Sequence, residues 1–215
     1  MHSSVKNLTY INNKIKEVIN FQTNIIAISK TFGPEKIKPL LDFGHLHYGE
    51  NKVQECISKW PELKLRYSNI KLHMVGKLQS NKVKDCIKHF DFIHSLDSKK
   101  LAKKINDEQK KVNKKLKIFV QVNIGNEMQK SGVHKNDLED LLSYCSEINL
   151  DLLGLMCIPP THANPNIYFS EMHLLNKKYG FYELSMGMSS DYLEAIKFGS
   201  TFVRIGSKIF GNRDQ

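Results

Sequence analysis

Arginine is scarce in this sequence, which limits what its positive charge can mean. Only Arg66, Arg204 and Arg213 are arginines among the 32 basic residues, while the net charge is +10. Specific recognition of nucleic acids uses the planar guanidinium fork for phosphates and bases. We therefore interpret the charge as a solvated lysine-rich surface and expect no nucleic-acid partner. A basic module that binds nucleic acid is kept as an alternative hypothesis.

Long apolar segments are also missing. No apolar run reaches the length of a membrane span, and residues 1–20 contain neither the apolar core of a signal peptide nor an arginine. We therefore expect no membrane partner and a cytoplasmic location. Val5, Leu8 and Ile15 recur close to helical spacing, which predicts an additional N-terminal helix with one face packed inward.

Cysteine pairs and metal-ligand patterns are absent as well. The four cysteines contain no CxxC pair, which indicates reduced thiols rather than a disulfide framework. His45 and His47 are two residues apart without cysteine or acidic partners at suitable spacing. The sequence predicts no metal site.

A regular alternation of short apolar runs and longer amphipathic runs fills the chain. The predicted strands are Ile25–Ser29, His45–Gly49, Leu72–Val75, Phe92–Leu96, Ile118–Asn123, Leu152–Ile158, Glu183–Met186 and Phe202–Ile205. The predicted helices between them are Glu35–Phe43, Lys52–Lys59, Asn81–His89, Ser98–Lys114, Lys135–Glu147, Asn166–Lys178 and Asp191–Phe198. No linker, repeat or low-complexity segment interrupts the pattern, so residues 1–215 are predicted to form a single domain.

Alternating strands and helices indicate an α/β protein with a parallel sheet and helical crossovers. Eight strands in a chain of this length favour a single (β/α)8 TIM barrel. An open doubly wound sheet is the alternative, because periodicity alone does not distinguish the two.

Polar and glycine-rich residues follow the predicted strands, where a barrel places its sites. Lys30 follows the first strand, and the loops at 185–191 and 204–207 follow the last two. Glycines and serines there expose backbone N–H groups that suit a phosphate, although ordinary helix capping would give the same residues. A lysine beside an apolar strand is favoured in its neutral, nucleophilic form, although it could equally extend its ammonium into water. Together they suggest a sugar-phosphate aldolase or a site for pyridoxal 5'-phosphate (PLP).

Several longer segments resemble the PLP homeostasis proteins, the YggS/PROSC family of PLP-binding proteins. The matching segments are AISKTFG (27–33), YGENKVQE (48–55), HMVGKLQSNK (73–82), QVNIGNEMQKSG (121–132), GLMCIPP (154–160), LSMGMSSDYLEAI (184–196) and VRIGSKIFGNR (203–213). They occur in the order of the family and span nearly the whole chain. The resemblance implies a type III PLP-binding barrel, similar to the N-terminal barrel domain of alanine racemase.

The resemblance also implies roles for individual residues. Lys30 is expected to carry PLP covalently as a Schiff base, and Arg204 to face the pyridine nitrogen. Ser189, Gly206 and Ser207 are expected to hold the phosphate. The residues expected to line the ring pocket are Asn51, His73, Met156 and Ser185.

The family has no established substrate turnover and is associated with PLP supply, so we expect no enzyme activity and no catalytic residues. PLP-dependent apo-enzymes are the expected recipients, and we expect a monomer, with a dimer as the alternative. An arginine facing the pyridine nitrogen leaves it unprotonated and weakens the ring as an electron sink. Because Gln215 follows the eighth strand closely, we expect no second domain of the kind that supplies a tyrosine acid/base in the racemase, and therefore no efficient racemisation. A small PLP enzyme, a racemase or an amino-acid lyase, remains the alternative.

A few positions depart from the family or lack an assigned role. Lys52 stands where an aromatic residue is frequent, and the 160–184 segment is short. Cys157 lies near the expected cofactor. Lys77, Lys82 and Lys130 lie on the predicted rim, where they are candidates for helping cofactor release.

Overall fold

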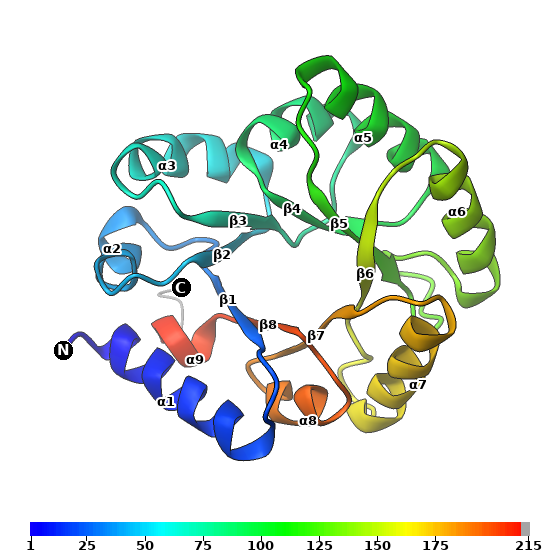
Figure 1. Cartoon of the computed structure of the whole chain (residues 1–215). Coiled ribbons are helices and arrows are strands. Elements are labelled where there is room, and N and C mark those ends of the chain that lie inside the picture. Colours follow the sequence, from blue (N-terminus) through cyan, green and yellow to red (C-terminus); the bar gives the residue numbers. More distant parts are fainter. Residues whose placement is uncertain (212–215) are drawn as a thin grey trace.

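A computed structural model describes residues 1–211, which fold around a closed barrel of eight parallel strands in the order β1 to β8. Strand β1 pairs with both β2 and β8, and this second pairing closes the ring. Helices surround the strands on the outside (Figure 1). The predicted (β/α)8 TIM barrel is confirmed, and the open doubly wound sheet is wrong. Arg213, near the end of the last matching segment, lies outside the described residues.

The elements alternate along the chain as the sequence pattern requires. The strands are β1 (Asn24–Ile28), β2 (His47–Glu50), β3 (Lys71–Met74), β4 (Phe92–Leu96), β5 (Lys117–Val122), β6 (Leu152–Cys157), β7 (Glu183–Met188) and β8 (Phe202–Ile205). The helices are α1 (Ser3–Val18), α2 (Pro34–Asp42), α3 (Val53–Arg66), the 3-10 turn η1 (Ser80–Lys82), α4 (Val83–His89), α5 (Lys99–Val112), α6 (Lys135–Glu147), α7 (Pro165–Lys178), α8 (Tyr192–Lys197) and α9 (Ser207–Phe210).

Five predicted boundaries were wrong by more than one residue: the start of β2, the end of β7, the end of α3, the start of α4 and the end of α5. Two of them have identifiable reasons. Strand β2 starts at His47 rather than His45, because the His45 N–H donates to Leu40 O and so belongs to the turn that ends α2. Helix α3 continues past Pro61 to Arg66, although it was predicted to end at Lys59. The buried Trp60 ring packs on the Tyr48 ring with centroids 5.0 Å apart. This packing favours the longer helix, although Pro61 has no backbone N–H to donate.

The core has two layers because successive side chains of a strand point to opposite faces. A large cluster fills the space between strands and helices. The smaller cluster fills the barrel interior and consists of Ile26, Ile28, Phe92, Phe119, Met156 and Phe202. Alternation then continues from Ile26 and Ile28 to Lys30, and from Phe202 to Arg204. The interior core therefore ends in two basic side chains at the C-terminal rim.

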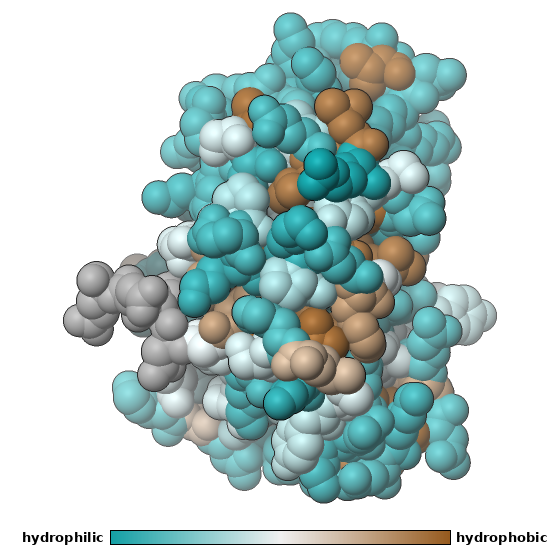
Figure 2. Space-filling model, turned by 90° about the vertical axis from the view of Figure 1, so that its left-hand side faces the viewer, coloured by the Kyte–Doolittle hydropathy of each residue, from teal (hydrophilic) through white to brown (hydrophobic). Residues whose placement is uncertain are grey.

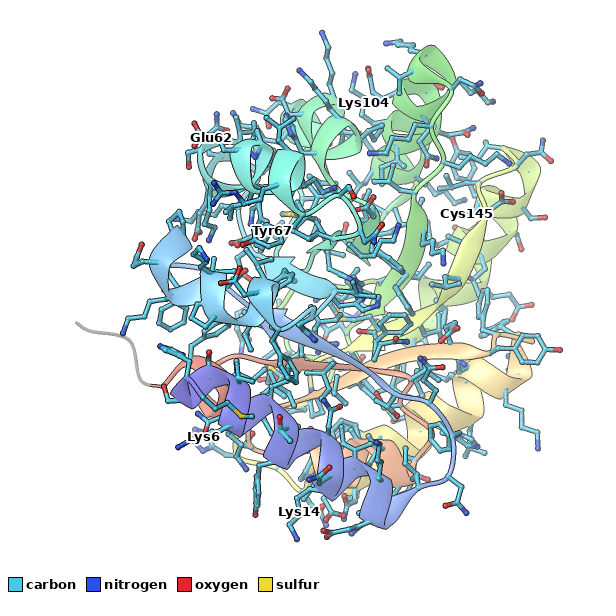
Figure 3. The ribbon with its side chains drawn as sticks, turned by 60° about the vertical axis from the view of Figure 1, so that its left-hand side comes forward. Lys6, Lys14, Glu62, Tyr67, Lys104 and Cys145 are labelled. Carbon is cyan, nitrogen blue, oxygen red and sulfur yellow. The ribbon has the colours of Figure 1, made fainter. Side chains whose placement is uncertain are left out.

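Helix α1 is the predicted additional N-terminal helix, and it packs beside α8 and α9. Its buried face consists of Val5, Leu8, Ile11 and Ile15 with Ser4. The Asn7 side chain donates a hydrogen bond of 3.0 Å to Ile209 O of α9. Lys6 is exposed on the opposite side of α1 and points away from the barrel (Figure 3). The first helix thus holds the last described helix in place.

Hydrophilic side chains cover most of the face in Figure 2, and the hydrophobic ones form small separate groups. Within residues 1–211, no helix combines the length and the hydropathy needed to cross a membrane.

Candidate functional site

A cavity of about 770 Å³ opens at the C-terminal ends of the strands. Its lining residues are Ile28, Lys30, Phe32, Asn51, Val75, Ile158, Met188, Ser189, Ser190, Arg204, Gly206, Ser207 and Gly211. They come from strands far apart in the sequence, which the barrel brings to one rim. The volume suits a small molecule, and the lining combines apolar side chains with a few polar groups, as is usual for such sites.

The structure brings most of the predicted site residues together at this cavity. Those that line it are Lys30, Asn51, Ser189, Arg204, Gly206 and Ser207. His73, Met156 and Ser185 are fully buried in the barrel interior beneath the cavity and do not line it. Val75 and Ile158 line it instead, each two residues further along the strand direction. The strand alternation could have indicated these two positions; contact of the three deeper residues with a cofactor stays a prediction.

Lys30 lies in the tight turn after β1, at the edge of the cavity. Thr31 has a φ of 70°, and the Phe32 N–H donates to Ser29 O at 3.1 Å. The Thr31 N–H donates to the Glu55 carboxylate of α3. The backbone of this turn is therefore fixed from both sides, and Lys30 is directed over the cavity by the turn that bears it.

A buried ion pair lies behind this turn, between the barrel and α3. Lys59 Nζ lies 2.7 Å from the Glu50 carboxylate, with side-chain exposures of 6% and 0%. The same ammonium donates to Ser29 O at 2.9 Å and to Phe32 O at 3.1 Å. Burial raises the pKa of Glu50, while the hydrogen bonds from Lys59, Trp60 and Ser29 oppose this rise. The ion pair fastens both ends of the turn that carries Lys30.

Arg204 is buried at the floor of the cavity, with an exposure of 5%. Its guanidinium donates to Ser185 O at 2.9 Å, to Ser185 Oγ at 2.7 Å and to Cys157 O at 2.8 Å. All three acceptors are neutral, and no carboxylate among the described residues forms an ion pair with this side chain. Burial lowers the pKa of Arg204, but guanidinium remains charged in proteins. The floor of the cavity therefore carries a positive charge that forms no ion pair with a carboxylate of residues 1–211, although the charge of Asp191 raises the pKa of Arg204.

The two predicted glycine-serine loops meet at the edge of the cavity formed by β7 and β8, and β8 is the direct neighbour of β1. The Gly206 N–H donates to Ser189 Oγ at 3.3 Å, which joins the loop after β7 to the loop after β8. Gly187 has a φ of 90°, and a Cβ there would lie 2.5 Å from the Ala195 Cβ. Glycine is therefore required at Gly187 for both conformation and space. The hydroxyls of Ser189 and Ser207 and the adjacent backbone suit an anionic group.

The rim lysines without an assigned role lie in different places. Lys52, Lys77 and Lys82 line a second cavity of about 530 Å³, which shares Asn51 with the first. Lys130 instead pairs with the Glu127 carboxylate and donates to Pro159 O at 3.2 Å. Lys52, Lys77 and Lys82 are therefore the lysines whose cavity adjoins the Lys30 cavity, at Asn51.

Cys157 contributes to the site through its backbone. The residue is fully buried, its carbonyl accepts from Arg204, and burial raises the pKa of its thiol to about 12. A thiol with such a pKa remains protonated near neutral pH.

Comparison with known proteins places the whole chain in one group. Residues 5–214 match the family described as "Alanine racemase, N-terminal domain". The chain is 40% identical to a pyridoxal phosphate homeostasis protein of Vibrio alginolyticus over 204 residues, covering 88% of this chain and 86% of that protein. It is also 40% identical to a protein of the same name from Aquifex aeolicus over 199 residues, with the same coverage.

Solved structures agree with this grouping. The barrel superposes on PipY of Synechococcus elongatus with PLP bound at a TM-score of 0.88 and 30% identity, covering 97% of this chain and 100% of PipY. An alanine racemase of Clostridium difficile matches with a TM-score of 0.73 and 19% identity, covering 98% of this chain and 57% of the racemase. The racemase comparison shows a shared fold for the barrel part of that enzyme.

Proposed function

Because the chain belongs to the pyridoxal phosphate homeostasis proteins, within the alanine racemase N-terminal domain family, we propose that it binds PLP in the Lys30 cavity. Its proposed role is to hold and supply the cofactor inside the cell without turning over a substrate. The PLP-bound structure of PipY supports the choice of ligand.

The observation that carries the proposal is the buried charge of Arg204. A buried cation with only neutral hydrogen-bond acceptors is costly unless a ligand completes its surroundings. PLP fits this demand, because its pyridine nitrogen accepts a hydrogen bond and its phosphate adds negative charge to the same cavity. The Arg204 Nε–H makes no hydrogen bond within residues 1–211 and is available to face the ring nitrogen.

Lys30 is the proposed covalent anchor. Its neutral Nζ amine would hold the aldehyde carbon of PLP as a Schiff base, with one water as the other product. The fixed turn from Ser29 to Phe32 keeps the backbone of Lys30 at one place on the rim, where its side chain lines the cavity. When bound, PLP supplies an electron-withdrawing ring, which an arginine beside its nitrogen leaves unprotonated.

The phosphate is proposed to bind where the loops after β7 and β8 meet. Ser189, Gly206 and Ser207 line the cavity there, and Ser190 adds a further hydroxyl that the sequence analysis did not include. The ring would lie between these loops and Lys30. Asn51 is proposed to lie at the edge of the ring, and Val75 and Ile158 to form the apolar walls of the ring pocket. The residues proposed to support the pocket from the barrel interior are His73, Met156 and Ser185.

A carrier is favoured over an enzyme by the chemistry of the lining. Apart from Lys30 and Arg204, the described lining residues contain no carboxylate, histidine, tyrosine or cysteine. Racemisation and elimination at an amino acid need a group that moves a proton at the substrate Cα, and efficient racemisation needs one on each face. A small PLP-dependent racemase or lyase is therefore the second candidate, supported by the shared barrel alone.

The remaining parts of the proposal concern context. We take residues 1–215 as one PLP-binding unit that acts as a monomer in the cytoplasm and passes PLP to apo-enzymes. Size-exclusion chromatography with light scattering tests the monomer, and cell fractionation tests the location. Reactivation of a PLP-dependent apo-enzyme by the loaded protein, measured against free PLP, tests the transfer.

Borohydride reduction tests the proposed anchor most directly. The purified chain is incubated with PLP, the absorption of the lysine linkage is recorded, and the reduced protein is mapped by peptide mass. We expect the added mass on the peptide containing Lys30, and complete loss of the absorption in Lys30→Ala. Lys77→Ala, in the neighbouring cavity, is the matched control and should label like the natural chain. Label on another lysine would refute the anchor, and steady Lys30-dependent turnover of an amino acid would refute the carrier role.

A further inference from the structure

An unbroken row of three imidazoles crosses the barrel interior from β2 to β4. His47 Nδ1 lies 2.9 Å from His73 Nε2, and His73 Nδ1 lies 2.9 Å from His94 Nε2. His94 Nδ1 lies 2.9 Å from Ser185 Oγ on β7, which also accepts from Arg204. We call these residues, His47, His73, His94 and Ser185, the histidine chain. It links Arg204 to the N-terminal end of the barrel.

The histidine chain is packed as rigidly as the aromatic core around it. His73 and His94 have 0% exposure, and His73 stacks on Phe92 with ring centroids 4.0 Å apart and planes at 16°. His94 stacks on Phe119 at 4.5 Å and 22°. His47 is only partly buried, at the start of β2. The inner imidazoles are therefore held in plane by neighbouring rings, which fixes their nitrogen positions.

The direction of donation follows from Arg204. A guanidinium only donates, so Ser185 Oγ must accept from it. The hydroxyl proton of Ser185 then needs an acceptor, and His94 Nδ1 is the recorded neighbour of that oxygen that can accept. With Nδ1 accepting, neutral His94 carries its proton on Nε2 and donates to His73 Nδ1. By the same rule His73 donates from Nε2 to His47 Nδ1.

Each hydrogen bond of the histidine chain is therefore donated in the same direction, away from Arg204 and toward the N-terminal end of the barrel. In the opposite direction His94 would donate from Nδ1, and the buried Ser185 hydroxyl proton would be left without an acceptor. Leaving a buried donor unpaired is costly. Burial lowers the pKa of both inner histidines, and the charge of Arg204 lowers that of His94 further. The inner links are thus neutral as well as directional.

We propose that the histidine chain is a positioning device for Arg204 that holds its guanidinium in the orientation needed toward the ring nitrogen of the ligand. The inference rests on the proposed PLP site for its ligand. His94 and His73 act through Ser185: they keep the hydroxyl lone pairs turned to NH1. The Nε–H of Arg204 then stays directed toward the cavity before the ligand arrives. A fixed donor loses less entropy on binding and so binds more tightly.

The tautomer states test the direction in the unmodified, ligand-free protein. Nitrogen NMR of histidine labelled with ¹⁵N distinguishes a protonated from an unprotonated ring nitrogen. We expect His73 and His94 to be neutral with the proton on Nε2. A proton on Nδ1 of either ring would overturn the proposal. This experiment needs no variant and no cofactor, so it stands even if PLP binding fails.

Variants at His94 test the effect on Arg204. His94→Gln retains an acceptor and a donor, whereas His94→Leu removes both, and Ile26→Val is the control for a change of interior packing. We expect the Arg204 Nε–H to exchange with water roughly tenfold faster in His94→Leu and to be restored within about threefold in His94→Gln. Only three arginines need assignment. PLP dissociation constants should follow the same order. If His94→Leu and His94→Gln increased the Arg204 exchange rate and the PLP dissociation constant equally, His94 would have a packing role only, and the proposal would be overturned.

The outcomes separate the two proposals. Suppose that the natural chain does not bind PLP, but His73 and His94 are protonated on Nε2 and the Arg204 Nε–H exchanges faster in His94→Leu than in His94→Gln. The proposed function then fails and the positioning inference stands. If PLP binds Lys30 but the Arg204 exchange is unchanged in His94→Leu, the positioning inference fails and the proposed function stands.

Discussion

Two buried polar networks flank the cavity, and they treat charge in opposite ways. Outside the barrel wall, the Lys59 ammonium pairs with the carboxylates of Glu50 and Glu55, and it also binds the turn that bears Lys30. Inside the wall, the histidine chain is neutral and leaves the charge of Arg204 without an acidic partner among residues 1–211. A buried charge with its counter-charge stabilises local structure, whereas an open buried charge marks the place that a ligand completes. The contrast shows which network is expected to carry stability and which to carry binding.

Removing one member of the closed pair should have the largest effect on stability. Lys59→Met leaves the Glu50 carboxylate buried without its counter-charge, which costs about 3–5 kcal/mol of the free energy of unfolding. Urea unfolding followed by circular dichroism measures this. Lys38→Met, which breaks an exposed pair with Asp42, is the control and should cost less than about 1 kcal/mol. A loss in Lys59→Met as small as in the control would show that the closed pair carries no stability.

Acid should weaken the fold through the histidine chain. Burial keeps the pKa of His73 and His94 well below 6.5, so these rings stay neutral in the folded state. In the unfolded chain they take up protons as the pH falls through about 6.5, and binding more protons favours that state. Stability is therefore complete above this pH and decreases below it, by up to about 1.4 kcal/mol per pH unit for each ring.

Urea unfolding at several pH values between about 7 and 5 measures this slope. Burial also lowers the pKa of His45 and His47 to about 4, so four histidines contribute to the slope, and His94→Gln, which lacks one of them, should reduce it by roughly a quarter. An unchanged slope in this variant would contradict the assignment of acid sensitivity to the histidine chain.

Neutralising the open charge should have the smallest effect on stability and a clear effect on binding. Arg204→Gln removes a buried cation and retains an amide donor, so the free energy of unfolding without ligand should change by less than about 1 kcal/mol. The PLP dissociation constant should rise roughly tenfold, because a charge-assisted hydrogen bond is lost. Absorbance titration with PLP and urea unfolding measure the two quantities. A stability loss as large as that of Lys59→Met would remove the distinction between the two networks.

Sequence reasoning predicted several residues that lie at the rim of the cavity, because position at the end of a strand is visible in the periodicity. Lys30 and Arg204 continue the inward alternation of β1 and β8, and the glycine-serine loops follow β7 and β8 at recognisable turns. Turn-forming residues and strand alternation are local properties, so one sequence is enough to read them.

The two buried networks could not be predicted in the same way. The links from His47 to His73 and from His73 to His94 join residues 26 and 21 positions apart, and the link to Ser185 joins residues 91 apart. Such contacts depend on strand tilt and register in the closed barrel, which the periodicity does not specify. The only local signal is that the three histidines occupy inward positions of consecutive strands, where apolar residues are usual. His73 entered the analysis through the family resemblance, and His94 did not enter it at all.

The contact between α1 and α9 has a consequence for biosynthesis. Asn7 bonds to Ile209, and β1 pairs with β8, so the beginning and the end of the chain are joined across nearly its whole length. Ser207, which lines the cavity, belongs to the helix that α1 holds. During translation these partners meet only after the last strand has left the ribosome. The cavity is thus completed only after α9 has been synthesised, and a nascent chain can capture its ligand there only from that point on.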